Sequence, residues 1–216
     1  MIKALIFDLD GTLLYTLDSI ARTCNKVLRA HALPPVTHVQ LKQFVGDGVI
    51  DLLKRAFAAG GSDEIPNDNT VKEFKQYFRE DCNYHVAPYD GIPEVLEYCK
   101  THGILLACNT NKPHENALKV IHTHFGDSFQ AVQGNKEGIP KKPAADGVFQ
   151  ILQRLDVCAS EAVYIGDSDV DVFTAKAARM RSFGAAWGYR GTEELMKSGA
   201  DEILSHPIQI IDYIKL

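Results

Sequence analysis

The chain has 216 residues, of which 45% are hydrophobic and 24% are charged, and its formal net charge is −5. These totals are ordinary for a globular protein, and the mild acidity gives no indication of a nucleic-acid or anionic-membrane surface. The five cysteines fit no metal or redox spacing, and no stretch approaches the roughly 18 apolar residues that a membrane span needs. We therefore expect a cytoplasmic protein with reduced thiols, no signal peptide, and neither nucleic acid nor membrane as a partner.

The first predicted element is a short buried strand, Lys3 to Phe7, which ends at the carboxylates of Asp8 and Asp10. Residues i and i+2 of an extended segment share a side, so both carboxylates enter one small site. Two such close carboxylates repel each other and lose hydration, which is costly without a cation or a shared proton. Gly11 lets the chain turn at once, and Thr12 adds a hydroxyl near this predicted phosphate or metal pocket.

Apolar residues at helical spacing predict helices and no convincing strand from Leu17 to about His85. Proline breaks the pattern after the first helix, and the Gly46-Asp47-Gly48 turn separates the second from the third. The expected helices span Leu17 to His31, Thr37 or His38 to Phe44, Val49 to Ala59, and Asn67 to Tyr84. This segment is interpreted as an insertion, a helical cap.

Strands and helices alternate from Tyr89 onward, which predicts a parallel sheet covered on both faces. Ligands of such sheets bind beyond the carboxyl ends of the strands, where Asn109, Thr110, Asp167 and Asp171 are found. The expected strands are Ile104 to Cys108, Ala131 to Val132, Ala162 to Ile165, Arg181 to Ala186 and Glu202 to Leu204. The expected helices are Gly91 to His102, Pro113 to His124, Ala145 to Leu155, Val172 to Met180, Glu193 to Ser198 and Pro207 to Ile214.

Four stretches, taken in order, resemble the motifs of the haloacid dehalogenase superfamily, in particular of its phosphatases. Asp8-Leu9-Asp10-Gly11-Thr12 matches the DxDGT signature, and Thr110 matches the second motif. Lys142, directly before Pro143, matches the third, and Asp167 with Asp171 matches the fourth. Within the superfamily the chain is most similar to the phosphoglycolate phosphatase group, through Phe44 to Gly48, Asn109 to Pro113, and Phe183 to Arg190.

The resemblance implies an α/β fold: a Rossmann-like three-layer parallel-sheet core with an inserted α-helical cap domain. Residues 1–16 and 86–216 would form the core, and residues 17–85 would form the cap. The implied reaction is hydrolysis of a small phosphate monoester through an aspartyl-phosphate, with Mg²⁺ as cofactor. The implied partner is a small phosphorylated metabolite, and the protein is expected to be a monomer or a homodimer.

The resemblance also assigns roles to residues. Asp8 would attack phosphorus, and Asp10 would protonate the leaving alcohol and then take a proton from water. Mg²⁺ would be held by the Asp8 carboxylate, the Asp10 backbone carbonyl and Asp167, while Asp171 would orient water or Lys142. Lys142 would offset negative charge in the transition state. The phosphate-binding set would be Asp8, Leu9, Asp10, Thr110, Asn111 and Lys142. In the cap, Lys42 and the turn Gly46, Asp47 and Gly48 are the candidates for contacting the leaving group.

Several alternatives stay open at this point. Thr110 could simply end a strand, Lys141 competes with Lys142, and Asp169 and Asp171 could be acids at a helix N-terminus. The Gly46 turn could merely separate two helices. A phosphomutase would use the same core residues, and a non-catalytic phosphometabolite-binding module is the alternative from another class. A dehalogenase is disfavoured, because it needs neither Asp10 nor a metal. The chain departs from the usual pattern at Tyr15-Thr16, Ala145 and Arg179.

Overall fold

The computed structural model describes residues 1–215 and divides into two compact units. One unit combines Met1–Tyr15 with the chain from Pro88 onward, and the other is Thr16–Ala87. These limits differ by one or two residues from those expected.

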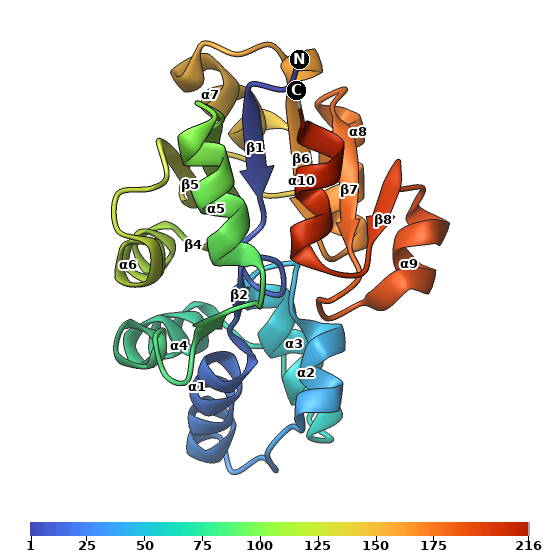
Figure 1. Ribbon diagram of the computed structural model, residues 1–216. Helices are drawn as coiled ribbons and strands as arrows, with labels where there is room; N and C mark the ends of the chain where they lie inside the picture. The colour runs from blue at the N-terminus through green and yellow to red at the C-terminus, as the bar shows by residue number, and fades with distance from the viewer. Residues whose placement is uncertain (216) are drawn as a thin grey trace. The chain divides into compact units, whose positions relative to one another are not determined.

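The first unit is built on a six-stranded sheet with the strand order β5-β4-β1-β6-β7-β8 (Figure 1). All of its pairings are parallel, and Ala4 of β1 lies opposite Leu105 on one side and Ala162 on the other. The strands are β1 (Ala4–Phe7), β4 (Leu105–Pro113), β5 (Ala131–Asn135), β6 (Ala162–Gly166), β7 (Arg181–Ala185) and β8 (Glu202–Leu204). The expected α/β fold with a parallel-sheet core is confirmed.

Helices cover both faces of this sheet, and an apolar strand buried on both faces needs such cover. Figure 1 shows α5 and α10 in front of the sheet, while α7 and α8 pack on the face to which Ala4 and Ile6 contribute. The helices are α5 (Ile92–Thr101), α6 (His114–Phe125), α7 (Asp146–Leu155), α8 (Asp169–Ala177), α9 (Gly191–Ser198) and α10 (Ile210–Ile214), with 3₁₀ turns η1 (Ala159–Glu161) and η2 (Pro207–Gln209).

Strand β4 is longer than expected. The polar run that begins at Asn109 was expected to end the strand, but the strand continues to Pro113 with an irregular register against β5. Polar side chains are tolerated here because partners from other strands and loops satisfy them: the Asn109 amide donates to Tyr164 Oη (3.3 Å), and the Asn111 amide donates to the Lys142 carbonyl oxygen (3.1 Å). The longer strand carries these side chains to the edge where the sheet ends.

Helix α8 begins at Asp169, three positions before the expected start at Val172. Asp171 accepts hydrogen bonds from the backbone N–H and the hydroxyl of Ser168 at 3.1 and 2.7 Å, which caps the first turn. Two short strands that the sequence did not predict, β2 (Leu14–Tyr15) and β3 (Ala87–Pro88), form a separate two-stranded sheet. Two residues are too few for an alternating pattern.

The second unit contains four helices: α1 (Leu17–Ala30), α2 (His38–Phe44), α3 (Val49–Ala59) and α4 (Asp68–Asp81). Thr37 and Gln40 form a capping box at α2, and the Asn67 side chain accepts from two backbone N–H groups at α4. Phe57, Phe74 and Phe78 are buried among these helices. The all-helical prediction for this segment is confirmed.

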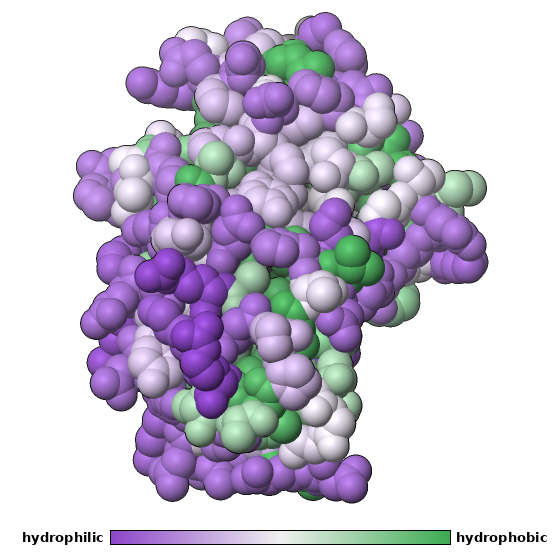
Figure 2. All heavy atoms as spheres, turned by 90° about the horizontal axis from the view of Figure 1, so that it is seen from below, coloured by the Kyte–Doolittle hydropathy of each residue, from purple (hydrophilic) through white to green (hydrophobic). Residues whose placement is uncertain are grey.

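Apolar side chains also remain on the surface of this unit, since Val39, Ile50 and Ile65 are 78%, 51% and 72% exposed. The space-filling view shows hydrophobic atoms gathered in a patch that hydrophilic side chains border (Figure 2). Over residues 1–215, every helix is too short or too polar to cross a lipid bilayer.

Candidate active site

The candidate site lies at the carboxyl ends of three adjacent strands of the first unit, β4, β1 and β6. The chain runs from β1 to β4 and β5 on one side and later to β6, β7 and β8 on the other, so β1 marks the switch point of the sheet. Asp8 follows β1 directly and is buried. Gly11 turns the chain with φ at 90°, and an added Cβ at this position would collide with the Asp167 carboxylate.

Lys142 joins carboxylates from two of these strand ends. Its ammonium Nζ lies 2.7 Å from Asp8 Oδ1 and 2.7 Å from Asp171 Oδ1, and the lysine side chain is only 4% exposed. Its backbone N–H donates to Asn111 Oδ1 at 2.9 Å, so the end of β4 holds the lysine in place. Lys141, by contrast, is exposed.

The acids that follow β6 have different surroundings. Asp171 accepts from Lys142 on one oxygen and from Ser168 on the other, so it both caps α8 and holds the lysine. Asp167 accepts the backbone N–H of Tyr189 at 2.6 Å and the Thr12 hydroxyl at 3.4 Å. The chain around Tyr189, which had no predicted role, therefore orients Asp167.

The predicted phosphate-binding residues of β4 lie at the same edge of the sheet. Thr110 and Asn111 are both buried. Thr110 Oγ1 accepts the backbone N–H of Lys112 at 3.2 Å, and the Asn111 side chain is fixed by the backbone of Lys142. Leu9, between the two aspartates of β1, is fully buried.

Besides Tyr189, the site contains Lys112 and Tyr164, to which the sequence pattern assigned no role. Lys112 Nζ lies 2.7 Å from Asp10 Oδ1, and the lysine side chain is 1% exposed. The buried Tyr164 hydroxyl donates to the Asn109 carbonyl oxygen at 3.1 Å and lies 3.5 Å from Asp171 Oδ1. Lys112 could have been suspected from the sequence, because it lies two residues after Thr110. Tyr164 could not, because it looks like an ordinary aromatic residue of an apolar strand.

The site is negatively charged and buried. Burial raises the pKa of Asp8 to about 7, an effect that Lys142 opposes and Asp171 reinforces. Burial also raises the pKa of Asp167 well above its ordinary value, reinforced by Asp171 and Asp8. Burial alone would lower the pKa of Lys142, but Asp171 and Asp8 outweigh it and raise that pKa. Three carboxylates share one ammonium, so a further cation is favoured here.

The donor set fits a hard divalent cation such as Mg²⁺. Asp8, Asp167 and Asp171 each offer an oxygen, and these oxygens lie within 4.8 Å of one another. Asp8 Oδ1 is buried, and the Lys142 ammonium Nζ lies 2.7 Å from it. Each of these acids also has a partner in the protein: Lys142 contacts Asp8 and Asp171, and the Tyr189 N–H donates to Asp167.

The residues expected to contact the leaving group belong to the helical unit. Gly46, Asp47 and Gly48 form the turn between α2 and α3, and both glycines have positive φ, 125° and 91°. Asp47 pairs with Arg55 at 2.6 Å, which braces this turn. Lys42 is exposed in the last turn of α2.

Comparison with known proteins gives consistent matches over the whole chain. The family model of haloacid dehalogenase-like hydrolases matches residues 5–185. A phosphoglycolate phosphatase from Rhodospirillum rubrum is 33% identical over 88% of this chain and 81% of its own length. An N-acetylmuramic acid 6-phosphate phosphatase from Pseudomonas aeruginosa is 28% identical over 99% of this chain and 95% of its own. The crystal structure of a protein assigned as a phosphoglycolate phosphatase from Lactobacillus delbrueckii superposes with a TM-score of 0.90, at 30% identity and 98% coverage of both chains.

Proposed function

Because the chain belongs to the haloacid dehalogenase-like hydrolases and is a phosphatase of phosphate monoesters, we propose that it hydrolyses a small phosphorylated metabolite through an aspartyl-phosphate on Asp8. The observation that carries this proposal is the buried Asp8–Lys142–Asp171 cluster with Asp167 beside it. A carboxylate held against a lysine at the end of a central strand is placed to act as a nucleophile toward an anionic phosphoryl group.

In the proposed reaction each residue has a separate role. Asp8 attacks phosphorus, and Asp10 gives its proton to the leaving alcohol and later accepts one from the attacking water. The Thr110 hydroxyl and the Asn111 backbone N–H hold the phosphoryl oxygens, with Leu9 completing the loop after β1. Lys142 offsets charge that builds up on the phosphoryl group, and Asp171 keeps that ammonium in position.

We further propose that Asp8, the Asp10 carbonyl and Asp167 hold Mg²⁺, which supplies charge neutralisation for the phosphate when bound. Tyr189 and Thr12 donate hydrogen bonds to the Asp167 carboxylate and would keep it in position to hold the ion. The closeness of the buried Asp8 and Asp167 carboxylates, whose oxygens lie within 4.8 Å of each other, supports this assignment.

The first experiment measures phosphate release from p-nitrophenyl phosphate with and without Mg²⁺. We expect turnover that depends on Mg²⁺ and is abolished in a folded Asp8→Asn variant. Full activity in that variant would contradict the proposed nucleophile, and activity unaffected by a chelator would contradict the metal.

We propose that the substrate is 2-phosphoglycolate or a similar phosphate ester, because phosphoglycolate phosphatases recur among the relatives. A panel containing 2-phosphoglycolate and N-acetylmuramic acid 6-phosphate should separate the candidates by kcat/KM. The helical unit, residues 17–85, is proposed to select the leaving group through Lys42, Gly46, Asp47 and Gly48. Gly46 or Lys42 variants with an unchanged substrate profile would refute this role.

A further inference from the structure

Lys112 is a buried lysine for which the proposed reaction, as described above, has no role. Its ammonium Nζ pairs with Asp10 Oδ1 at 2.7 Å, and its side chain is almost completely enclosed. Burying an ammonium group is costly unless a counter-charge holds it. The pair also joins the turn after β1 to the end of β4, since the two residues are 102 positions apart in the chain.

The backbone of Lys112 acts on a second group of the site. Its N–H donates to Thr110 Oγ1 at 3.2 Å. This bond uses the threonine oxygen as acceptor, which leaves the hydroxyl hydrogen to point at a phosphoryl oxygen. One residue therefore orients both the proposed proton donor and a proposed phosphate ligand.

We propose that Lys112 is a positioning residue that holds the Asp10 carboxyl group for proton transfer to the leaving alcohol. This inference rests on the proposed function. With Lys112 on Oδ1, the proton that Asp10 transfers in the proposed reaction is the one on Oδ2. As an Asp8 oxygen bonds to phosphorus and the P–O ester bond breaks, that proton moves to the ester oxygen. Water then attacks phosphorus, the Asp8–phosphorus link breaks, and Oδ2 accepts a proton from the water.

The test compares esters whose leaving groups differ in their need for a proton. An alkyl ester such as 2-phosphoglycolate needs one, whereas p-nitrophenolate leaves as a stable anion. We expect Lys112→Met to lower kcat for the alkyl ester roughly tenfold or more, because a well-placed general acid contributes about 10²–10⁴-fold. Turnover of p-nitrophenyl phosphate should fall much less, and Lys112→Arg should restore part of the alkyl-ester activity.

Lys176→Met is the matched control, because this lysine donates to the Ser198 carbonyl oxygen outside the site, at 2.6 Å. This substitution should change kcat for the two esters only slightly and by the same factor. In an Asp10→Asn background, Lys112→Met should add no further loss for the alkyl ester. Equal losses for both esters, or fully additive losses, would overturn the proposal. A wild-type protein inactive on both esters would instead overturn the proposed function.

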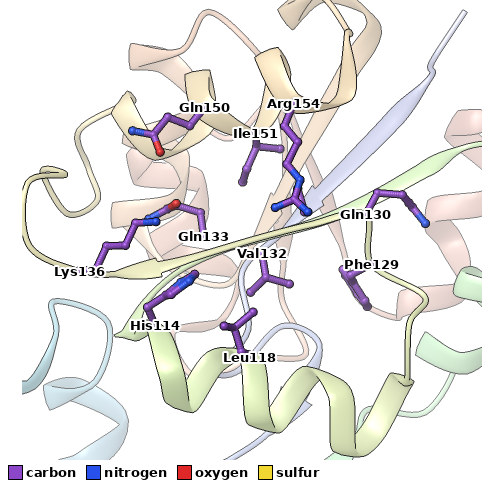
Figure 3. A pocket seen from close by; sticks show the side chains of 11 residues that line it. His114, Leu118, Phe129, Gln130, Val132, Gln133, Lys136, Gln150, Ile151 and Arg154 are labelled. Carbon is purple, nitrogen blue, oxygen red and sulfur yellow. The ribbon is translucent and has the colours of Figure 1, made fainter.

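A second observation concerns a cavity of about 370 Å³ at the outer edge of strand β5. Figure 3 shows Arg154 reaching toward the strand from α7 and Leu118 and His114 reaching toward it from α6. Lys136 lies just beyond the end of the strand, and Val132 and Ile151 complete the apolar part of the wall. The volume is within the range of small-molecule sites.

Among the residues that the structure describes, the wall carries cations and amides but no carboxylate. Arg154 and Lys136 have no ion-pair partner among residues 1–215. His114 Nδ1 accepts the Gly134 N–H at 3.1 Å, which leaves the proton of the neutral ring on Nε2 as a donor. Burial and the nearby Lys136 lower the pKa of His114, in keeping with a neutral ring beside a positive charge.

We infer that this cavity binds a small organic anion, with its phosphate, sulfonate or carboxylate at Arg154 and Lys136 and its apolar body on Leu118, Val132 and Ile151. The charge complementarity argues for an anion. The same charges argue against a second copy of the chain that pairs with the edge strand β5. In such a dimer, Arg154 and Lys136 of one copy would lie near the same cations of the other. This cationic wall contrasts with the chain as a whole, whose formal net charge is −5.

The probe is 8-anilinonaphthalene-1-sulfonate, an apolar aromatic anion, titrated by fluorescence without added Mg²⁺. We expect Arg154→Gln to weaken binding roughly tenfold, since a hydrogen bond to a charged group contributes about that much. Leu118→Ser should weaken it too, and AMP should displace the dye. Lys119→Gln removes the same charge from α6, next to Leu118 but outside the residues that line the cavity, and should leave binding unchanged. Equal binding by Arg154→Gln and Lys119→Gln would overturn the inference, as would displacement by polyglutamate but not by AMP.

Discussion

The ammonium of Lys142 is the positive group placed between Asp8 and Asp171 in the candidate site. Replacing it by methionine leaves three buried carboxylates without that charge, so both substrate binding and transition-state stabilisation are lost. We expect Lys142→Met to lower kcat/KM for p-nitrophenyl phosphate by roughly 10²-fold or more. The exposed neighbour provides the control: Lys141→Met should retain activity. Comparable losses in the two variants would contradict the role given to Lys142.

The acids were expected at the ends of predicted strands, and Lys142 and Asp171 were chosen because they match the superfamily's motifs; the structure brings Asp8, Lys142 and Asp171 together. The partners that hold them could not be found that way. Lys112 meets Asp10 across 102 positions, and the Tyr189 N–H meets Asp167 through a loop whose path the local pattern does not determine. Such contacts depend on strand order, and the sequence pattern alone does not specify strand order.

At the scale of elements, the end of α8 contains a strained residue. Arg179 follows this helix with φ at 54°, a conformation that favours glycine. We expect Arg179→Gly to increase the free energy of unfolding by about 1 kcal/mol, measured by urea denaturation. Asp156 ends α7 with φ at 55°, but aspartate tolerates this region better than arginine does. Asp156→Gly should therefore increase the free energy of unfolding by less than Arg179→Gly does. A loss of stability in Arg179→Gly would contradict the argument.

In the helical unit, α4 is tied to α1 by one buried acid. Asp81 accepts from Arg22 at 2.9 Å, from Thr23 at 3.2 Å and from Lys26 at 2.6 Å. Burial raises the pKa of Asp81, but the hydrogen bonds from Lys26 and Arg22 outweigh it and lower the pKa below its ordinary value. We expect Asp81→Asn to destabilise the protein by roughly 1–3 kcal/mol at neutral pH.

The pH dependence of this effect has a definite sign. A depressed carboxyl pKa contributes stability above the unfolded-state value of about 4, and this contribution is lost as the pH falls through the folded-state value. The difference between wild type and Asp81→Asn, measured by urea unfolding, should therefore shrink in acid. A difference that grows as the pH falls would contradict the ion-pair explanation.

The elements that sequence reasoning placed least well are those whose ends depend on distant partners. The polar end of β4 looked like a loop, but Tyr164 and Lys142 satisfy it as a strand. The start of α8 looked like a loop of acids, but Ser168 and Asp171 cap it. The apolar strands β1 and β6 were placed almost to the residue, because four or five consecutive buried residues determine them locally.

At the scale of the whole molecule, the negative site should couple metal binding to folding. A ligand that binds only the folded protein stabilises it by about 2.7 kcal/mol at 100 times its Kd. Calorimetry should therefore show a midpoint that rises with Mg²⁺ concentration. Asp167→Asn should reduce this rise, and Asp169→Asn, an acid outside the cluster, should not. A wild-type midpoint insensitive to Mg²⁺ would contradict a metal site at Asp8 and Asp167.

The most direct test of the account is to find the phosphoryl group on the protein. The Asp10→Asn variant, mixed with p-nitrophenyl phosphate and Mg²⁺ and quenched in acid, should accumulate the intermediate, because it lacks the base that activates water. Mass spectrometry of the peptide containing residues 3–10 should show one added phosphoryl group on Asp8 that is absent when Asp8 is also replaced by Asn. Phosphate release without this adduct, or a phosphoryl group on another residue, would contradict the central claim.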